Sequence, residues 1–253
     1  MRYLLKAFYI GGTSFLCSTF IDFLFDIAKL MTCFVLIILR FNHTYLFVGA
    51  TTAVISEKLS LKKIQYALAQ YTPHRPKLLE RSMQAAVAVV IREKLNQIEA
   101  LFILRSVREG DPWSGDMAFP GGHKEAIDLS LREAAQRETS EEIGLDLSQY
   151  GHFMGELDTI AVNPRHSKDM LVTPFVYCLS GVDIALNKNH EVADVFWGGL
   201  DQMIKGASLT EKTFKRNGAS QSFPGYALDG QVIWGLTFRV LEQFFSVIDL
   251  HDS

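Results

Sequence analysis

The sequence has few cysteines and no marked excess of charge of either sign. Its 253 residues include three cysteines, Cys17, Cys33 and Cys178, with no C-x-x-C spacing, so neither a disulfide framework nor a zinc knuckle is indicated. The 25 basic and 28 acidic side chains give a net charge of −3, which excludes a strongly basic nucleic-acid coat and a strongly acidic tail. Hydrophobic residues make up 48%, so the chain is not globally disordered. A compartment with reduced thiols, such as the cytoplasm, fits this composition.

The sequence also lacks the short signatures of several large enzyme classes. It contains no G-x-x-x-x-G-K-[ST], no G-x-G-x-x-G, no H-E-x-x-H and no G-x-S-x-G. These patterns carry the phosphate, dinucleotide, zinc and nucleophile chemistry of their classes. Kinase, dehydrogenase, zinc protease and serine hydrolase activities therefore have no support in the sequence.

The first 56 residues differ from the rest of the chain. They contain only six charged side chains with a net charge of +2, which leaves −5 for residues 57–253. Their charge-free runs, at 7–21, 30–39 and 41–56, are each shorter than the roughly 18 residues of a clean membrane-spanning helix. We therefore predict a boundary near residues 56–60, between an apolar N-terminal helical segment and a soluble domain.

Four interpretations of residues 1–56 stay open. Asp22, Asp26 and Lys29 would form one polar stripe on a helix, inside a hairpin of two short membrane helices. One interfacial helix, a signal peptide and a start codon placed too early are the alternatives. The expected location is the cytoplasm, with association on the cytoplasmic side of a membrane under the first two interpretations.

From residue 57 onward, short apolar runs are mixed with helical patterns. Helices are predicted at 59–70, 131–143 and 234–248. Short apolar or alternating runs predict strands at 84–91, 98–104, 117–119, 153–162, 171–179 and 192–197. Without strict alternation of strand and helix, this order favours an α/β fold with a mixed sheet flanked by helices.

Residues 121–145 carry the most informative pattern. Ser130 and Glu133 form a capping box and Gly144 can end a helix, so a helix is predicted between them. The spacing of three glutamates within it, at i, i+3 and i+4, puts their carboxylates on one face. They are Glu138, Glu141 and Glu142.

Three carboxylates on one face repel each other unless cations neutralise them. Hard divalent ions with oxygen ligands, Mg²⁺ or Mn²⁺, suit that task. Arg137 lies four residues before Glu141 and can brace it, and the turn at Gly122 lets a backbone carbonyl approach as a further ligand. Such a metal cluster suits diphosphate hydrolysis, because it polarises phosphorus and lowers the pKa of an attacking water.

The segment resembles the Nudix box, G-x5-E-x7-R-E-U-x-E-E-x-G-U, in which U is bulky and apolar. Arg137 to Leu145 match its second half, apart from Thr139 in the first apolar slot. Gly122 and Asp128 match the first half, with eight residues instead of seven before Arg137. Further fragments are similar to the coenzyme A diphosphatase branch of this family, namely LRS at 104–106, FPGG at 119–122, VTPFVY at 172–177 and IWGLT at 233–237.

The resemblance implies a Nudix-like α/β/α sandwich with a mixed sheet. It also implies divalent-metal-dependent hydrolysis of a diphosphate bond in a nucleoside diphosphate derivative, with coenzyme A or acyl-coenzyme A as the leading substrate. The three glutamates would hold Mg²⁺ or Mn²⁺, and Arg137 would orient them. Family members often add a loop glutamate as base or extra ligand. Glu191 is the candidate here, with Asp116 and Glu125 as alternatives.

Basic and aromatic side chains near the box are candidates for substrate binding. Arg105, Arg108 and Arg165 could hold phosphates, and Trp113 could stack on a purine ring. The coenzyme A branch is expected to show an H-x-G-E-like core before FPGG. Here Trp113 stands in the place of the histidine, and Asp116 keeps the acid.

A second hypothesis is a membrane-tethered module that binds nucleotides with little or no catalysis. Within the enzyme hypothesis, ADP-ribose, dinucleoside polyphosphates and oxidised nucleotides are alternative substrates. In each case the expected partner is a small nucleotide and not a nucleic acid, because the chain has no basic excess.

Overall fold

The computed structural model describes residues 36–41, 44–49, 58–77, 82–111, 113–162, 170–179, 184–216 and 219–249. The chain divides into two compact units, Met1–Glu57 and Lys58–Ser253. Among the described residues, no helix has the length and the apolar character needed to cross a membrane. Membrane association of residues 1–56 therefore stays a prediction.

The described part of the first unit is a β-hairpin. Strands β1 (Leu36–Phe41) and β2 (Thr44–Gly49) pair antiparallel. Both are rich in β-branched and aromatic residues, which favour a pleated strand over a helix. The predicted helical segment is thus wrong for these residues, and the rest of that prediction lies outside the described residues.

A mixed sheet forms the centre of the second unit. Its neighbouring strands, in order, are β10 (Val192–Gly199), β4 (Gln97–Arg105), β3 (Met83–Lys94), β9 (Met170–Leu179) and β7 (Gly151–Glu156). The β3–β9 pair is parallel over ten residues, whereas the other neighbouring pairs are antiparallel. Three short strands lengthen this sheet, β5 (Met117–Ala118) beside β4, β6 (Gly121–His123) beside β3, and β8 (Ile160–Val162) beside β9.

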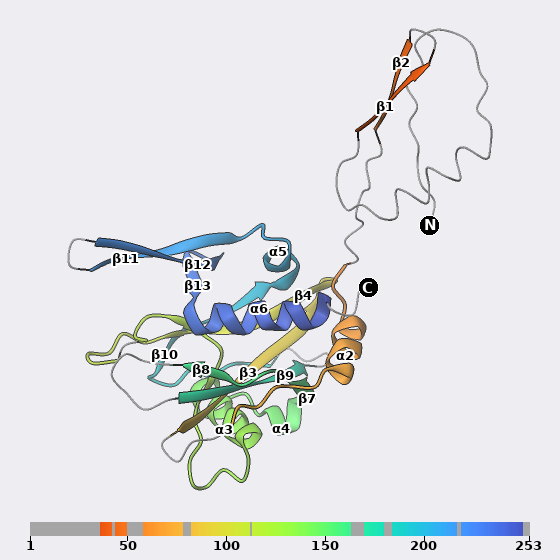
Figure 1. The fold of residues 1–253 in the computed structure, drawn as a ribbon. Coiled ribbons are helices and arrows are strands. Elements are labelled where there is room, and N and C mark those ends of the chain that lie inside the picture. The colour runs from red at the N-terminus through yellow and green to blue at the C-terminus, as the bar shows by residue number, and fades with distance from the viewer. Residues whose placement is uncertain are drawn as a thin grey trace. The chain divides into compact units, whose positions relative to one another are not determined.

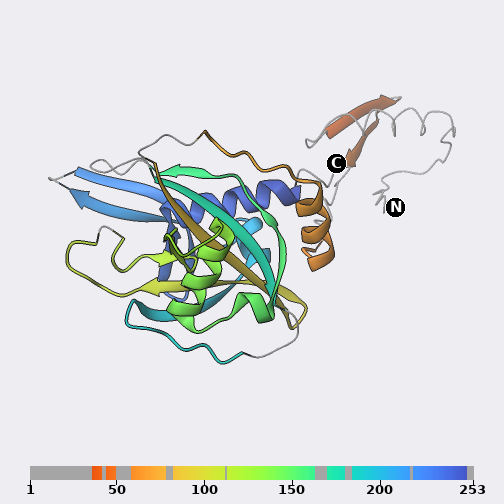
Figure 2. The same cartoon turned by 90° about the horizontal axis from the view of Figure 1, so that it is seen from below.

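Helices cover both faces of this sheet (Figures 1 and 2). Successive side chains of a strand point to opposite faces, and in β3 this assigns Val89 and Ile91 to one core and Ala88 and Val90 to the other. The first core is closed by α2 (Leu61–Gln70) and α6 (Gly235–Asp249). The second is closed by α3 (Leu131–Ile143) and α4 (Leu147–Tyr150). The predicted α/β/α sandwich with a mixed sheet is confirmed.

The predicted strand at 153–162 is two strands in the structure. β7 ends at Glu156 and β8 begins at Ile160. Between them, the Leu157 N–H donates to the Pro174 carbonyl and the Thr159 N–H to the His74 carbonyl. Because the second bond leaves the sheet for the chain after α2, the ladder is interrupted at this point.

A small antiparallel sheet was not predicted. It contains β11 (Leu209–Arg216), β12 (Ala219–Leu228) and β13 (Gln231–Trp234), and follows α5 (Leu200–Ile204). The polar residues of β11 and β12 obscure the strand pattern. The turn at Asp229 and Gly230, both with positive φ, is the dipeptide typical of a two-residue hairpin, so a signal was present.

Candidate active site

The predicted helix over 131–143 is α3, and its ends are set as the sequence indicates. The Ser130 hydroxyl accepts from the Glu133 N–H at 3.1 Å, and the Glu133 carboxylate accepts from the Leu129 N–H at 2.9 Å. Gly144 ends the helix with a φ of 69°. The buried Ala135 and Ile143 face the sheet, which leaves the glutamates toward the glycine turn at β6.

Glu142 is the most buried carboxylate of the helix, with 2% of its surface exposed. Its Oε2 atom accepts a hydrogen bond from the Gly121 N–H at 2.9 Å. Burial raises the pKa of Glu142 to about 8, the Gly121 N–H opposes this, and the Glu138 charge adds to it. The carboxylate is thus held away from water with one donor to stabilise its charge.

Glu138 and Glu141 share one guanidinium group. Arg137 Nη1 donates to Glu138 Oε1 and to Glu141 Oε2, each at 3.1 Å. Burial raises the pKa of Glu138, Arg137 opposes this, and the charges of Glu141 and Glu191 raise it further. The acidic side chains of this face therefore act on one another.

Asp128 holds Arg137 in place. Arg137 Nε and Nη2 donate to the two Asp128 carboxylate oxygens at 3.0 Å each, and Nη2 also donates to the His123 carbonyl. Hydrogen bonds from Arg137 hold the pKa of Asp128 below its usual range. Asp128 is 5% exposed. Its place in the box was predicted, but this positioning contact was not.

Glu191 lies in the turn just before β10, and its charge acts on the acidic face of α3. Its charge acts on both Glu138 and Glu142, and its Oε1 atom accepts from Arg108 Nη1 at 2.8 Å. The structure thus places this sequence-predicted residue where its charge acts on α3. Of the alternatives, Glu125 is exposed and Asp116 accepts from the Trp234 indole N–H at 2.8 Å.

Arg105 and Arg108 lie beside these carboxylates. Arg105 Nη2 donates to Asp111 at 2.7 Å, and the Arg105 charge acts on Glu142. Arg105 Nε and Arg108 Nη2 are buried without a hydrogen-bond partner within the described part of the chain. Trp113 is 39% exposed, and Arg165 lies outside the described residues.

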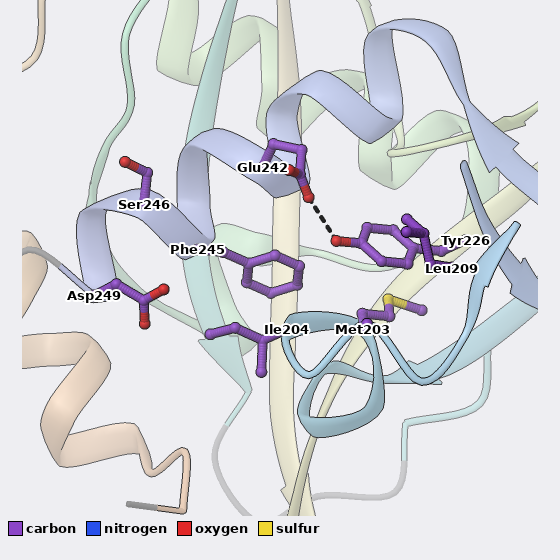
Figure 3. Close-up of a pocket in the computed structure, with 9 residues that line it drawn as sticks. Met203, Ile204, Leu209, Tyr226, Glu242, Phe245, Ser246 and Asp249 are labelled. Atoms are coloured by element: carbon purple, nitrogen blue, oxygen red, sulfur yellow. Dashed lines mark hydrogen bonds between the residues drawn. The ribbon is translucent and has the colours of Figure 1, made fainter. Parts of the chain in front are cut away.

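A pocket of about 550 Å³ lies elsewhere in the unit, between α5, β12 and α6. Figure 3 shows Met203, Ile204 and Phe245 along it, with Tyr226 bonded to Glu242. The Tyr226 hydroxyl donates to Glu242 Oε1 at 2.5 Å. No sequence-predicted site residue lines this pocket.

A model of the NUDIX domain matches residues 82–218, more than half of the chain. The chain belongs to the Nudix family. The matched region runs from β3 through β11 and includes α3, called the Nudix helix below, and the glycine turn at β6. The prediction of a Nudix hydrolase is confirmed at the level of the family.

Three relatives illustrate the similarity. An uncharacterized protein of Schizosaccharomyces pombe is 37% identical over 107 residues, which cover 41% of this chain but only 32% of the yeast protein. The uncharacterized Nudix hydrolase NudL of Photorhabdus laumondii is 29% identical over 175 residues, or 69% of this chain and 89% of NudL. Human mitochondrial coenzyme A diphosphatase NUDT8 is 29% identical over 167 residues, or 66% of this chain and 70% of the human protein.

The donor set on the Nudix helix fits a divalent cation of the kind that Nudix hydrolases generally use. Its carboxylates are hard oxygen ligands. The buried Glu142 carboxylate accepts one hydrogen bond from the part of the chain that the structure describes, from the Gly121 N–H. Within the described residues, no three His, Cys, Asp or Glu side chains are already gathered around one point. The guanidinium groups of Arg137 and Arg108 supply the counter-charge instead.

Proposed function

We propose that this Nudix protein hydrolyses a diphosphate bond in a nucleoside diphosphate derivative, with Mg²⁺ or Mn²⁺ as cofactor. Coenzyme A or an acyl-coenzyme A is the leading substrate, and the products are an adenosine bisphosphate and a phosphopantetheine. The observation that carries the proposal is the buried Glu142 carboxylate at a glycine turn, on which the charges of Glu138 and Glu191 both act. The similarity to the human coenzyme A diphosphatase supports the substrate.

Glu138, Glu141 and Glu142 would hold the cation, with the Gly122 carbonyl as a further ligand. When bound, the cation polarises the phosphorus and lowers the pKa of the attacking water. Arg137, itself fixed by Asp128, orients the carboxylates.

Arg105 and Arg108 would bind the phosphates, because each has a buried N–H group without an acceptor in the described residues. A phosphate oxygen at Arg108 would compete with Glu191 for that guanidinium group. Glu191 would then be available to take a proton from water. Trp113 and Arg165 stay candidates for further substrate contacts.

A substrate panel on the full chain tests this function. Coenzyme A, acetyl-coenzyme A, ADP-ribose and a dinucleoside tetraphosphate would each be incubated with Mg²⁺ or Mn²⁺, and the products identified by mass spectrometry. We expect metal-dependent release of phosphopantetheine from coenzyme A. Cleavage of ADP-ribose alone would contradict coenzyme A as the substrate but support diphosphate hydrolysis as the reaction. Tight nucleotide binding without any cleavage would favour the membrane-tethered binding module.

A methyl group at position 122 is expected to disturb the proposed metal ligands. A Cβ there would lie 2.4 Å from the Glu138 carboxyl carbon, so the Gly122→Ala side chain must displace that carboxylate. We expect Mn²⁺ to bind about tenfold more weakly, a loss of about 1.4 kcal/mol. Titration followed by electron paramagnetic resonance of free Mn²⁺ measures this.

Gly199→Ala is the matched control, because a Cβ there has open space and the backbone φ is −70°. Unchanged Mn²⁺ affinity in Gly122→Ala, with the control also unchanged, would contradict the assignment of Glu138 as a ligand.

A further inference from the structure

The small sheet β11–β13 (Figure 1) has one face whose residues have no role in the proposed function. Lys212 on β11 pairs in register with Phe223 on β12, and Gly225, two residues further along β12, pairs with Trp234 on β13. Cross-strand partners and residues two apart lie on the same face of a sheet. This aromatic face therefore presents Lys212, Phe214, Phe223 and Trp234 together.

The three rings form one cluster. The Phe214 centroid lies 4.7 Å from the Trp234 centroid and 6.0 Å from that of Phe223, and Phe223 lies 5.7 Å from Trp234. All three side chains are partly exposed. None belongs to the buried hydrophobic clusters of the described residues.

The opposite face of the same sheet already anchors it to the protein. Tyr226 and Ile233 point that way and are buried in the core with Phe245 of α6. The aromatic face is thus not required to attach the small sheet. Three large rings kept partly in contact with water are a surface suited to a flat ligand.

The aromatic face adjoins the candidate phosphate site. The Trp234 indole N–H donates to Asp116 Oδ1 at 2.8 Å, and the Asp116 carbonyl accepts from the Arg105 N–H at 3.0 Å. The Lys212 charge also acts on Asp116. A ligand with its phosphates at Arg105 would therefore have its remaining part close to these rings.

We propose that the aromatic face of Phe214, Phe223 and Trp234, with Lys212 at its edge, binds the nucleobase of the diphosphate substrate. This inference rests on the proposed function and specifies where the nucleoside is recognised. Every base has a π-face that stacks on aromatic side chains, and a lysine beside the stack suits an adjoining phosphate. The IWGLT run, in which Trp234 lies, thereby acquires a role.

Calorimetric titration of the full chain tests this subsite without requiring turnover. The probes are adenosine 5′-monophosphate and ribose 5-phosphate, which both carry one phosphate and differ by the base. We expect the wild-type chain to bind the first at least about tenfold more tightly, as stacking of one base predicts. Equal affinity for the two probes would overturn the proposal without any variant being made.

Phe223→Ala is expected to reduce the affinity for adenosine 5′-monophosphate about tenfold and to leave that for ribose 5-phosphate unchanged. Phe223→Tyr keeps the ring and is expected to bind as the wild type does. Tyr226→Phe, on the opposite face, is the control. Phe214→Leu replaces Phe223→Ala if circular dichroism shows that the latter does not fold. Unchanged nucleotide affinity in the folded variant, or equal loss for both probes, would overturn the subsite.

The outcomes separate this inference from the proposed function. Base-dependent binding without cleavage of any diphosphate would support the nucleobase subsite and contradict the proposed hydrolysis. Cleavage of coenzyme A by folded Phe223→Ala, or by the Phe214→Leu variant in its place, with a KM equal to that of the wild type would support the proposed hydrolysis and contradict the subsite. If the reaction and the subsite are both correct, Phe223→Ala raises the KM for coenzyme A and leaves kcat near the wild-type value.

Discussion

The Glu142→Gln substitution is expected to lower kcat for coenzyme A by about a hundred- to a thousandfold in saturating Mg²⁺. Loss of a carboxylate that holds the cation removes several kcal/mol of transition-state stabilisation, and each 1.36 kcal/mol is about tenfold in rate. Glu138→Gln is expected to have a comparable effect. Steady-state kinetics with mass-spectrometric product detection measures both.

The same substitution at Glu142 is not expected to destabilise the fold. The glutamine amide oxygen can still accept from the Gly121 N–H. The substitution also replaces a carboxylate whose charged form is disfavoured by burial with a side chain that is always neutral. Denaturant unfolding without added metal should therefore give a free energy of unfolding equal to or above that of the wild type. A fall in stability would mean that lost activity reports on folding instead of chemistry.

Glu242→Gln is the matched control for these two variants. Glu242 lies on α6, which covers the other face of the sheet, and bonds to Tyr226. We expect its kcat to stay within about twofold of wild type, because α6 and the Nudix helix pack in different cores of the unit. Near-wild-type turnover of both Glu138→Gln and Glu142→Gln would refute the metal assignment.

The Asp128→Asn substitution is expected to reduce both stability and activity. It removes the charge that accepts two hydrogen bonds from Arg137, and a hydrogen bond to a charged group contributes about 1.5–3 kcal/mol. We expect a loss of about 2 kcal/mol in the free energy of unfolding. Because Arg137 also binds Glu138 and Glu141, kcat should fall as well.

The pH dependence of the free energy of unfolding tests the ion pair between Asp128 and Arg137. The pKa of Asp128 is lowered in the folded state, so its stabilisation is complete above the unfolded pKa, about 3.9, and is lost as the pH falls through the folded value. The deficit of Asp128→Asn should thus be constant from about pH 8 to pH 5 and shrink below about pH 4. Asp194→Asn, in an exposed pair with Lys188, is the control. A deficit that grows on acidification would contradict the assigned pair.

Local patterns were enough to predict the Nudix helix and much of the central sheet. Ser130, Glu133 and Gly144 set the ends of α3 through contacts a few residues away, so neighbouring residues carry the whole signal. The apolar runs that became β3 and β9 are buried on both faces. Where the local signal was mixed, as in β11 and β12, or where a hairpin replaced the expected helix at 36–49, the sequence prediction failed.

The partners of the site residues depended on contacts between distant parts of the chain. Arg108 and Glu191 are 83 positions apart, and Trp234 and Asp116 are 118 apart. No short-range pattern encodes such a pair, because it exists only after β10 has joined β4 and β13 has approached β5.

By itself, the sequence determined the chemistry available to this protein. The order of residues along one helix places Glu138, Glu141 and Glu142 on a common face, since that arrangement follows from 3.6 residues per turn. Only the tertiary structure decided how that chemistry is held. Burial of Glu142 against the Gly121 N–H and the approach of Glu191 arise from packing the helix on the sheet, and packing depends on contacts that no local stretch contains.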